Sequence, residues 1–508
     1  MAHQAVSSAD ATTEALLLLS STAGTTPPAP APLLVGAPRR NRFAFVCATL
    51  ASVTTMLHGY NLTLMSGAEL FMREDVGLTD GEVEVLAGSM NVFMLASILA
   101  AGWVADHLGR RRTLVLANAF FVAGALAMSL GTSFAALMAA RFVTSVGSGL
   151  ARVVAPVYNA EISPPSTRGA LSSILDMFIN VGILLSYVSN YAFSGLPLHL
   201  GWRVMYGIGV VPPVFIAAGV LFMPESPWWL AMQGRHGDAR AVLLRTSDTP
   251  ADADLRLGEI KRAVADAEPP PAAAARHGGG AGDWKQLLVR RRPSTTSVRR
   301  ILTCVLGLHF FVQASGVDAI LLYSPLVFKA VGMASNSAVL GATVAIGAVK
   351  TCFILVGMLF TDRLGRRPLL LASTAGVATT TAALAVTLYV GSTSTMSSSP
   401  ATAAACLASV LAVVAMYSIG YGSVVSAYGA EVLPLRLRAQ GSSLAMAVNR
   451  LTCGVVSMTF ISLADGITMP GCFFLYAAVT AAAFVFVYTR LPETKGRSLE
   501  DMEVLFHK

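Results

Sequence analysis

Charge is scarce in this sequence. Only 13% of its 508 residues are Asp, Glu, Lys or Arg, whereas soluble proteins carry about 25%. Hydrophobic residues make up 54%, and the mean hydropathy is +0.64. So few charges cannot cover a water-facing surface, and lipid must therefore form part of the solvent of this chain. The composition excludes a soluble globular protein.

Cysteine is scarce too. The six cysteines lie in apolar stretches without paired or metal-ligand spacing, and we interpret them as small buried hydrophobic residues. The nearest approach to a nucleotide loop is Gly147-Ser148-Gly149, and Arg152 stands where a dinucleotide fingerprint needs its third glycine. The net charge of +8 comes mostly from short loops between apolar segments, which does not indicate a nucleic-acid partner. We therefore expect no enzyme activity, no cofactor and no metal.

What the sequence does contain is a repeat. The motif Asp-x-Leu-Gly-Arg-Arg occurs at 106–111 and again at 362–367, each time between two long apolar segments. Two further motifs follow in the same order in both halves. The first is a glutamate with an arginine seven positions later, and the second is a Pro-Glu turn. The residues are Glu161, Arg168 and Glu225 in the first half, and Glu431, Arg438 and Glu493 in the second. Three ordered matches at nearly constant separation predict two copies of one unit. Parallel repeats of this size in an apolar chain are typical of one class of secondary transporter.

About twelve apolar segments have the roughly 20 residues that a membrane-spanning helix needs. They predict an all-α membrane protein with twelve transmembrane helices in two six-helix halves, and the first two spans fall at 43–68 and 84–105. The expected parts are a disordered tail at 1–42, six-helix halves at 43–223 and 300–490, a polar insert at 224–299 and a second tail at 491–508. Lys and Arg gather in the tails, the insert and the repeated loops, so we expect these parts and both termini to be cytoplasmic.

Several motifs resemble those of the sugar porters of the major facilitator superfamily. They are the two Asp-x-Leu-Gly-Arg-Arg loops, Gly59-Tyr60, Pro224-Glu225-Ser226-Pro227 and Pro492-Glu493-Thr494. The stretches 313–318, 350–351 and 447–450 are similar to those of the plant polyol and monosaccharide transporters within that family. The resemblance covers the chain after the first tail. It implies the major facilitator fold and transport of hexoses or linear polyols by alternating access, usually with a proton.

The resemblance also implies which residues face the substrate. Carried over position by position, they are Asp176, Gln313, Asp318, Tyr323, Lys350 and Asn449. Amides, carboxylates and a phenol suit a polyhydroxylated ligand, which needs paired donors and acceptors. Ser426 stands where the family has a tryptophan over the sugar, so we expect a roomier and less selective site.

The repeated charges predict a cytoplasmic latch. A loop with several arginines cannot enter lipid, and its arginines can pair with acids at other helix ends. Such a cluster would close the cytoplasmic side in one state and break in the other, unless the charges only set the topology. The expected members are Asp106, Arg110, Arg111, Glu161, Arg168, Glu225, Asp362, Arg366, Arg367, Glu431, Arg438 and Glu493.

Arg141 and Arg152 in the fourth span are expected to take part in coupling. They are eleven residues apart, close to three helical turns, and so share one face. Their depths predict that Arg141 meets Asn61 and that Arg152 pairs with Asp176. The family's proton-coupled members have an aspartate at the position of Asn61, and an amide cannot titrate. Proton symport is therefore expected to be weak or lost.

Other possibilities remain open at this stage. If Asp176 or Asp318 binds and releases the coupled proton in place of the missing aspartate, the protein would be a fully proton-coupled symporter. A sugar sensor that does not transport is a further candidate, whereas a channel would more often be built from symmetric subunits. We expect a monomer that binds a sugar or polyol within the lipid bilayer. The plasma membrane is the expected location, and the vacuolar membrane is the rival.

Overall fold

The computed structural model describes residues 42–164, 168–267, 293–333, 335–393, 400–433 and 438–495. All of them belong to one unit, Asn41–Lys508. Residues 1–41 of the expected first tail (1–42) and residues 496–508 of the expected second tail (491–508) lie outside the described residues, and so do the side chains of Arg168, Asp362 and Arg438.

The first half forms six apolar spans. Its helices are α2 (Arg42–Val76), α3 (Asp80–Leu108), α4 (Arg110–Leu130), α5 (Phe134–Ile162), α6 (Arg168–Ala192), α7 (Leu198–Ile208) and α8 (Val211–Leu221). The last two are a single span, Leu198–Leu221, interrupted where Pro212 and Pro213 remove backbone donors. Three shorter helices follow the first half: α9 (Pro227–Met232), α10 (His236–Thr246) and α11 (Pro250–Ala267).

The second half forms six more spans. Its helices are α13 (Pro293–Ala314), α14 (Val317–Ala330), α15 (Asn336–Leu364), α16 (Arg366–Thr393), α17 (Pro400–Ile419), α18 (Tyr421–Val432), α19 (Arg438–Ile467) and α20 (Met469–Arg490). Two spans are again interrupted: α13 and α14 meet at Gly316, whose φ is +76°, and α17 and α18 meet at Gly420. The twelve predicted spans are confirmed, by length and composition, in the described residues.

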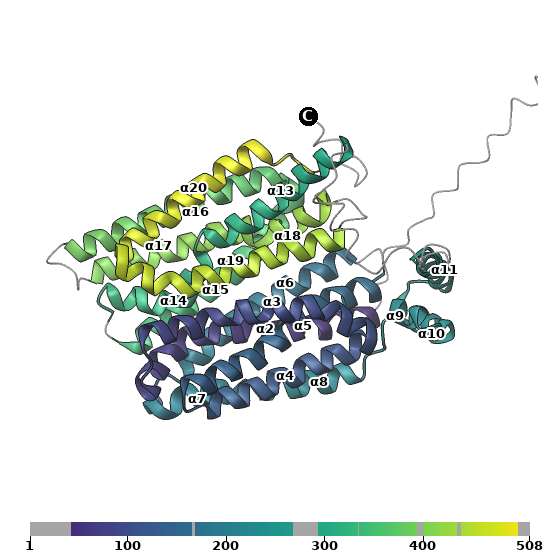
Figure 1. Ribbon diagram of the computed structural model, residues 1–508, viewed down its shortest axis with the longest axis horizontal. Coiled ribbons are helices and arrows are strands. Elements are labelled where there is room, and N and C mark those ends of the chain that lie inside the picture. Colours follow the sequence, from purple (N-terminus) through teal and green to yellow (C-terminus); the bar gives the residue numbers. More distant parts are fainter. Residues whose placement is uncertain are drawn as a thin grey trace, which may run out of the picture. The chain divides into compact units, whose positions relative to one another are not determined.

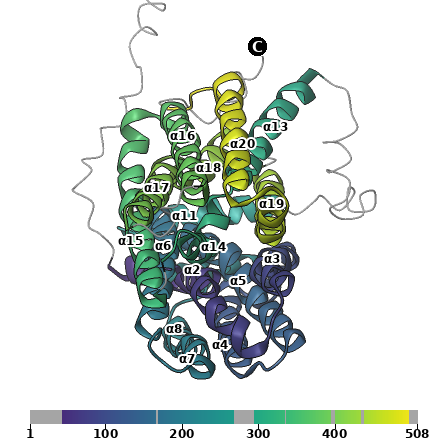
Figure 2. The same ribbon diagram turned by 90° about the vertical axis from the view of Figure 1, so that its left-hand side faces the viewer.

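The helices of each half pack against one another in matching pairs (Figures 1 and 2). In the first half α4 packs on α5 and α2 on α6, and in the second α16 packs on α17 and α13 on α19. The α2–α6 crossing is close because both helices present a glycine. A Cβ on Gly59 would lie 2.1 Å from the Ile179 carbonyl oxygen, and one on Gly182 would lie 2.0 Å from that of Met56.

The two halves meet along α3–α19, α6–α15 and α2–α14. We call the end of the bundle at Gly109 and Gly365 the turn end. Contacts between the halves involve the other end: Glu84, near the start of α3, reaches Ser462, near the end of α19. On the second pair, Gly347 of α15 lies against Tyr187 of α6. The bundle is therefore closed at the end opposite the turns.

Candidate functional site

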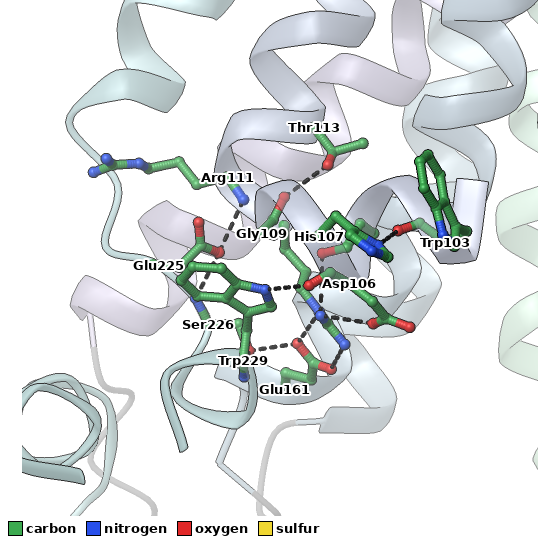
Figure 3. Close-up of polar contacts among 12 residues, drawn as sticks. Trp103, Asp106, His107, Gly109, Arg111, Thr113, Glu161, Glu225, Ser226 and Trp229 are labelled. Atoms are coloured by element: carbon green, nitrogen blue, oxygen red, sulfur yellow. Dashed lines mark hydrogen bonds and ion pairs between the residues drawn. The ribbon is translucent and has the colours of Figure 1, made fainter. Parts of the chain in front are cut away.

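At the turn end of the first half, the repeated loop forms a network of charges (Figure 3). Arg110 binds the Glu161 carboxylate through two hydrogen bonds of 3.1 Å, from Nε and Nη2, and its Nη1 donates to Asp106 at 3.0 Å. The Ser226 hydroxyl also donates to Glu161. The paired geometry is the strong, bidentate form of an Arg–carboxylate contact.

Among the described side chains, no guanidinium pairs with Glu225, contrary to the expectation for the latch. Its carboxylate accepts the backbone N–H groups of Arg111 at 3.0 Å and Ser226 at 2.9 Å (Figure 3). The first N–H groups of a helix have no partner within it, and its dipole favours an anion there, so a carboxylate caps α4. Gly109 leaves room for this cap: its φ is +91°, and a Cβ would lie 2.5 Å from Oε2 of Glu225.

The second half repeats this construction. Arg366 donates to Glu431 from Nε at 3.1 Å and from Nη2 at 2.8 Å, and the Thr494 hydroxyl donates to the same carboxylate at 2.7 Å. Glu493 accepts the backbone N–H groups of Arg366 at 3.0 Å and Arg367 at 2.9 Å, at the start of α16. The sequence repeat is thus a repeat of contacts.

Burial of Glu493 by itself would raise its pKa. The backbone N–H groups of Lys495, Arg366, Arg367 and Thr494 act the other way, and together they hold the pKa of this carboxyl below its ordinary value of 4.5. Hydrogen bonds to the ionised form favour that form.

Arg111 and Arg367 complete the two networks through backbone carbonyls. Arg111 Nη1 donates to the Met223 carbonyl at 3.1 Å, and Arg367 Nη2 donates to that of Tyr488 at 2.7 Å. Between the described side chains, no hydrogen bond or ion pair joins the network of the first half to that of the second. In this conformation each network ties together helix ends of its own half.

Arg141 and Asn61 meet, as their depths predict, but not through the Asn61 side chain. Arg141 Nη1 donates to the Asn61 backbone carbonyl at 3.2 Å, while Nε and Nη2 donate to the carbonyls of Leu86 at 3.3 Å and Ala87 at 3.4 Å. The Asn61 amide donates to the Leu57 carbonyl at 2.9 Å. Arg141, only 1% exposed, is therefore satisfied by backbone oxygens of α2 and α3.

A cavity lies between the two halves. It is lined by Leu62, Thr63, Ala87, Asn91 and Ile183 from the first half, and by Asp318, Leu321, Leu322, Lys350, Cys453 and Ser457 from the second. Asp318 and Lys350 thus lie on its wall, as the resemblance implies. Asp318 accepts a hydrogen bond from the Cys453 thiol at 3.4 Å, and Lys350 interacts electrostatically with Asp318 without a direct ion pair among the described residues.

Beside the cavity, a chain of polar groups crosses from one half to the other. Gln313 Nε2 donates to Asn449 Oδ1 at 3.3 Å. Arg450 donates to the same oxygen from Nε and Nη2, at 3.0 and 2.6 Å, and its Nη1 donates to Asn91 Oδ1 at 3.2 Å. Gln313 and Asn449 are therefore brought together, with Arg450 as their link to α3.

Tyr323, Ser426, Asp176 and Arg152 are not among the residues that line the cavity. Tyr323 is fully buried, stacks on Phe460 and donates to the Ser457 carbonyl at 2.7 Å. Ser426 is exposed on α18. Arg152 and Asp176 are half-buried and attract each other electrostatically, but among the described residues neither the Arg152 guanidinium nor the Asp176 carboxylate takes part in a hydrogen bond or an ion pair.

Two buried acids, Glu84 and Glu69, were not predicted from the sequence. Glu84 accepts the backbone N–H groups of Ile461 at 2.7 Å and Ser462 at 3.2 Å, and thereby ties α3 to α19. Glu69 on α2 is 2% exposed, and neither carboxylate oxygen has a hydrogen-bond partner among the described residues. The sequence feature that could have identified them is the position of an acid within or at the edge of an apolar span.

No group of His, Cys, Asp and Glu able to hold a metal ion occurs in the part of the chain that the structure describes.

Comparisons with known proteins agree with this geometry. The family model described as "Sugar (and other) transporter" matches residues 47–506. Polyol transporter 5 of Arabidopsis thaliana is 48% identical over 473 residues, which cover 92% of this chain and 87% of that protein. Putative polyol transporter 1 of the same plant is 49% identical, covering 92% of both chains. The inward-open structure of the xylose transporter XylE from E. coli superposes with a TM-score of 0.73 at 21% identity, covering 91% of this chain and all of that one.

Proposed function

The chain belongs to the sugar transporter family, and from that premise we propose that it carries polyols or monosaccharides across a membrane by alternating access of its two halves. The observation that carries the proposal is the cavity between the halves, with Asp318 and Lys350 on its wall. The relatives named above are transporters, which agrees with the expectation that the protein is not an enzyme. A carboxylate and an ammonium offer acceptors and donors to the hydroxyl groups of such a ligand.

Gln313 and Asn449 support the same ligand class from the second half. Their amides bond to each other, so a hydroxyl group that enters between them exchanges one hydrogen bond for another. Asp176, Tyr323 and Ser426 belong to the proposed site only if another conformation turns them toward the cavity.

Proton coupling is proposed to be absent at Asn61. Arg141 lies against the Asn61 backbone, and the Asn61 amide cannot bind or release a proton as an aspartate would. A carrier without a proton switch at this position moves its substrate downhill. The rival is a proton symporter in which another buried acid takes the proton.

The two charge networks of the turn end are proposed to act as rigid blocks during the exchange of states. The bundle is closed at the opposite end, and the networks are separate from each other; in the alternate state the blocks would meet and close the turn end. The turn end is proposed to be cytoplasmic, and the protein a monomer in the plasma membrane, with the vacuolar membrane as the alternative location.

Uptake by transport-deficient cells tests the proposal. Cells that express the full chain should accumulate labelled sorbitol, xylitol or glucose faster than cells with an empty vector, and a protonophore should not reduce the initial rate. Equal uptake in both cell lines for all three compounds would contradict the proposed carrier. Loss of uptake with the protonophore would favour the symporter.

A further inference from the structure

Glu69 on α2 is a buried acid without a partner. It is 2% exposed, and among the described residues neither of its carboxylate oxygens takes part in a hydrogen bond or an ion pair. A charged carboxylate in such surroundings is costly, whereas the neutral carboxylic acid loses far less when it leaves water. The burial of Glu69 therefore favours the form that carries a proton.

The basic groups near Glu69 do not supply the missing partner. The guanidinium of Arg141 on α5 donates to the backbone carbonyls of α2 and α3 described above. Arg73, one turn further along α2, pairs with Asp80 at 2.7 Å, and both side chains are about half exposed. Lys329 is partly exposed at the end of α14. Each of these three cations attracts a negative charge on Glu69, but none forms an ion pair with it in the described residues.

Two phenols also interact with Glu69, Tyr206 of α7 and Tyr323 of α14. Both hydroxyl groups donate to other partners, the Met65 sulfur and the Ser457 carbonyl. Further along, near the end of α2, the acid of the same helix that has a charged partner is Asp75, which pairs with Arg203 at 3.3 Å. Glu69 thus differs from the charged groups around it in having no counter-charge in contact.

Glu69 lies on the side of α2 that faces the second half. Three residues earlier, and so on the same face of the helix, Ser66 donates to the Leu321 carbonyl of α14 at 3.2 Å. Because α3 and α15 run to the turn end, α2 and α14, which precede them, both run to the opposite end, where the bundle is closed. Separation of the halves at that end would part α2 from α14 and bring water to Glu69.

We propose that Glu69 is a proton-binding site, which is occupied while the end opposite the turns is closed and is emptied when that end opens. This inference rests on the proposed function, because it requires the halves to separate there. On opening, the O–H bond of the carboxylic acid breaks, the proton passes to water and the carboxylate remains, since an exposed glutamate is ionised at neutral pH. Closure reverses the step.

The proton is not transported. Glu69 is buried while the turn end is open, so water reaches it from the opposite side alone, and the proton returns to the side from which it came in the loaded and in the empty carrier. The pH on that side therefore sets the balance between the two states without driving the substrate uphill. This role agrees with the absence of a proton switch at Asn61.

Distance measurements on the purified full-length protein test the site. Spin labels at Gly81→Cys and Gly466→Cys report the separation of α3 and α19, in a chain whose exposed Cys352 is changed to Ser. Because opening releases one proton, the ratio of long to short distances should rise about tenfold per pH unit between about pH 5 and about pH 8. A constant ratio, or one that rises toward acid pH as protonation of Glu84 would produce, would overturn the proposal.

Two variants assign the effect to Glu69. Glu69→Gln keeps the shape of the side chain but cannot titrate, and Glu69→Met replaces it with an apolar chain of similar length. In both, the ratio should favour short distances at every pH. Glu74→Gln, at the exposed end of the same helix, is the matched control and should keep the wild-type dependence. Wild-type dependence in a Glu69 variant that folds, or its loss in the control, would refute the assignment.

Vesicles containing the same protein separate this inference from the proposed function. Sorbitol entry should leave the internal pH unchanged, because the proton returns to its own side, and acidification would overturn the proposal. Uptake of labelled sorbitol together with a ratio that does not depend on pH would contradict the proton site alone. A ratio that depends on Glu69 and on pH, without uptake of sorbitol, xylitol or glucose, would contradict transport alone.

Discussion

The guanidinium of Arg141 donates to the backbone carbonyl of Asn61 at 3.2 Å, while the Asn61 amide donates to the carbonyl of Leu57 on its own helix. In the proton-coupled sugar porters that this chain resembles, this position holds a titratable aspartate. Here it holds a neutral amide beside the guanidinium of Arg141. Position 61 is within reach of a charged partner but supplies no charge of its own.

Restoring the acid should restore a proton-binding group. In Asn61→Asp, the carboxylate would lie beside Arg141, and its ionisation would depend on access to water. We expect a substrate-induced inward current in electrode recordings that grows as external pH falls, and no such current in the wild type. Asn61→Ala is the control, since it removes the amide without adding a titratable group. A variant current that does not depend on pH would place coupling elsewhere.

Glu84 should hold the bundle closed at the end opposite the turns. In Glu84→Gln the hydrogen bonds to Ile461 and Ser462 of α19 lose their ionic character, at a cost of roughly 1–2 kcal/mol, which is about a tenfold shift in a two-state population. Spin labels at Gly81→Cys and Gly466→Cys, where an added side chain meets open space, report the α3–α19 separation. Pulsed electron resonance should show a larger population at long distance.

Glu74→Gln is the control for this variant, because Glu74 is exposed near the end of α2. An unchanged distance distribution in Glu84→Gln, or the same change in Glu74→Gln, would contradict the role of Glu84.

Gly109 should not tolerate a side chain. Its φ of +91° is unfavourable for alanine, and a Cβ would lie 2.5 Å from the Glu225 carboxylate that caps α4. We expect Gly109→Ala to lower the melting temperature in detergent, through a loss of roughly 2 kcal/mol or more. Gly102→Ala in α3 is the matched control: nothing lies within 4 Å of its Cβ, and alanine favours a helix. Equal melting temperatures for the two variants would refute this account of the turn.

Glu493 should make stability depend on acidity. Its pKa lies below the ordinary 4.5 in the folded protein, so its stabilising effect is fully present above that value and is lost as pH falls through the folded-state pKa. At pH 7, Glu493→Gln should be less stable than the wild type by about 1 kcal/mol, the usual worth of a helix cap. The difference between their melting temperatures should shrink below about pH 4. A difference that is constant from pH 3 to 7 would show that the carboxylate charge is not involved.

Much of this arrangement follows from the sequence because it is repeated. The arginine-rich loop and the glutamate that follows it occur in both halves. Their repetition predicts the Arg110–Glu161 and Arg366–Glu431 pairs, which the structure contains. The roles of Glu225 and Glu493 were not predictable from charge alone. A carboxylate in a Pro-Glu turn can bind either a guanidinium or unpaired backbone N–H groups. The start of a helix supplies such N–H groups.

The acids at span ends show a different limit. The predicted first span ends at 68, one residue before Glu69, and the predicted second span begins at Glu84 itself. Hydropathy places the boundary of a span at its first charge, so such an acid is interpreted as water-facing. Only the contacts of neighbouring helices reveal that Glu69 and Glu84 are both buried.

Tyr323 illustrates a limit of residue-by-residue transfer. The resemblance implies that this phenol faces the substrate, but in the described conformation its hydroxyl bonds to the Ser457 carbonyl and its ring stacks on Phe460. Side-chain direction depends on how α14 rotates after the break at Gly316, which the sequence does not specify.

Counterflow in vesicles tests the central claim most directly. Vesicles with the purified protein are loaded with unlabelled sorbitol and diluted into a trace of labelled sorbitol, with no ion gradient. An alternating-access carrier should concentrate the label inside transiently above the external level, because the excess of unlabelled substrate inside occupies the inward-facing sites and so slows the exit of the label. Accumulation that never exceeds the external concentration, as a channel would give, or no entry of label at all, would contradict the account.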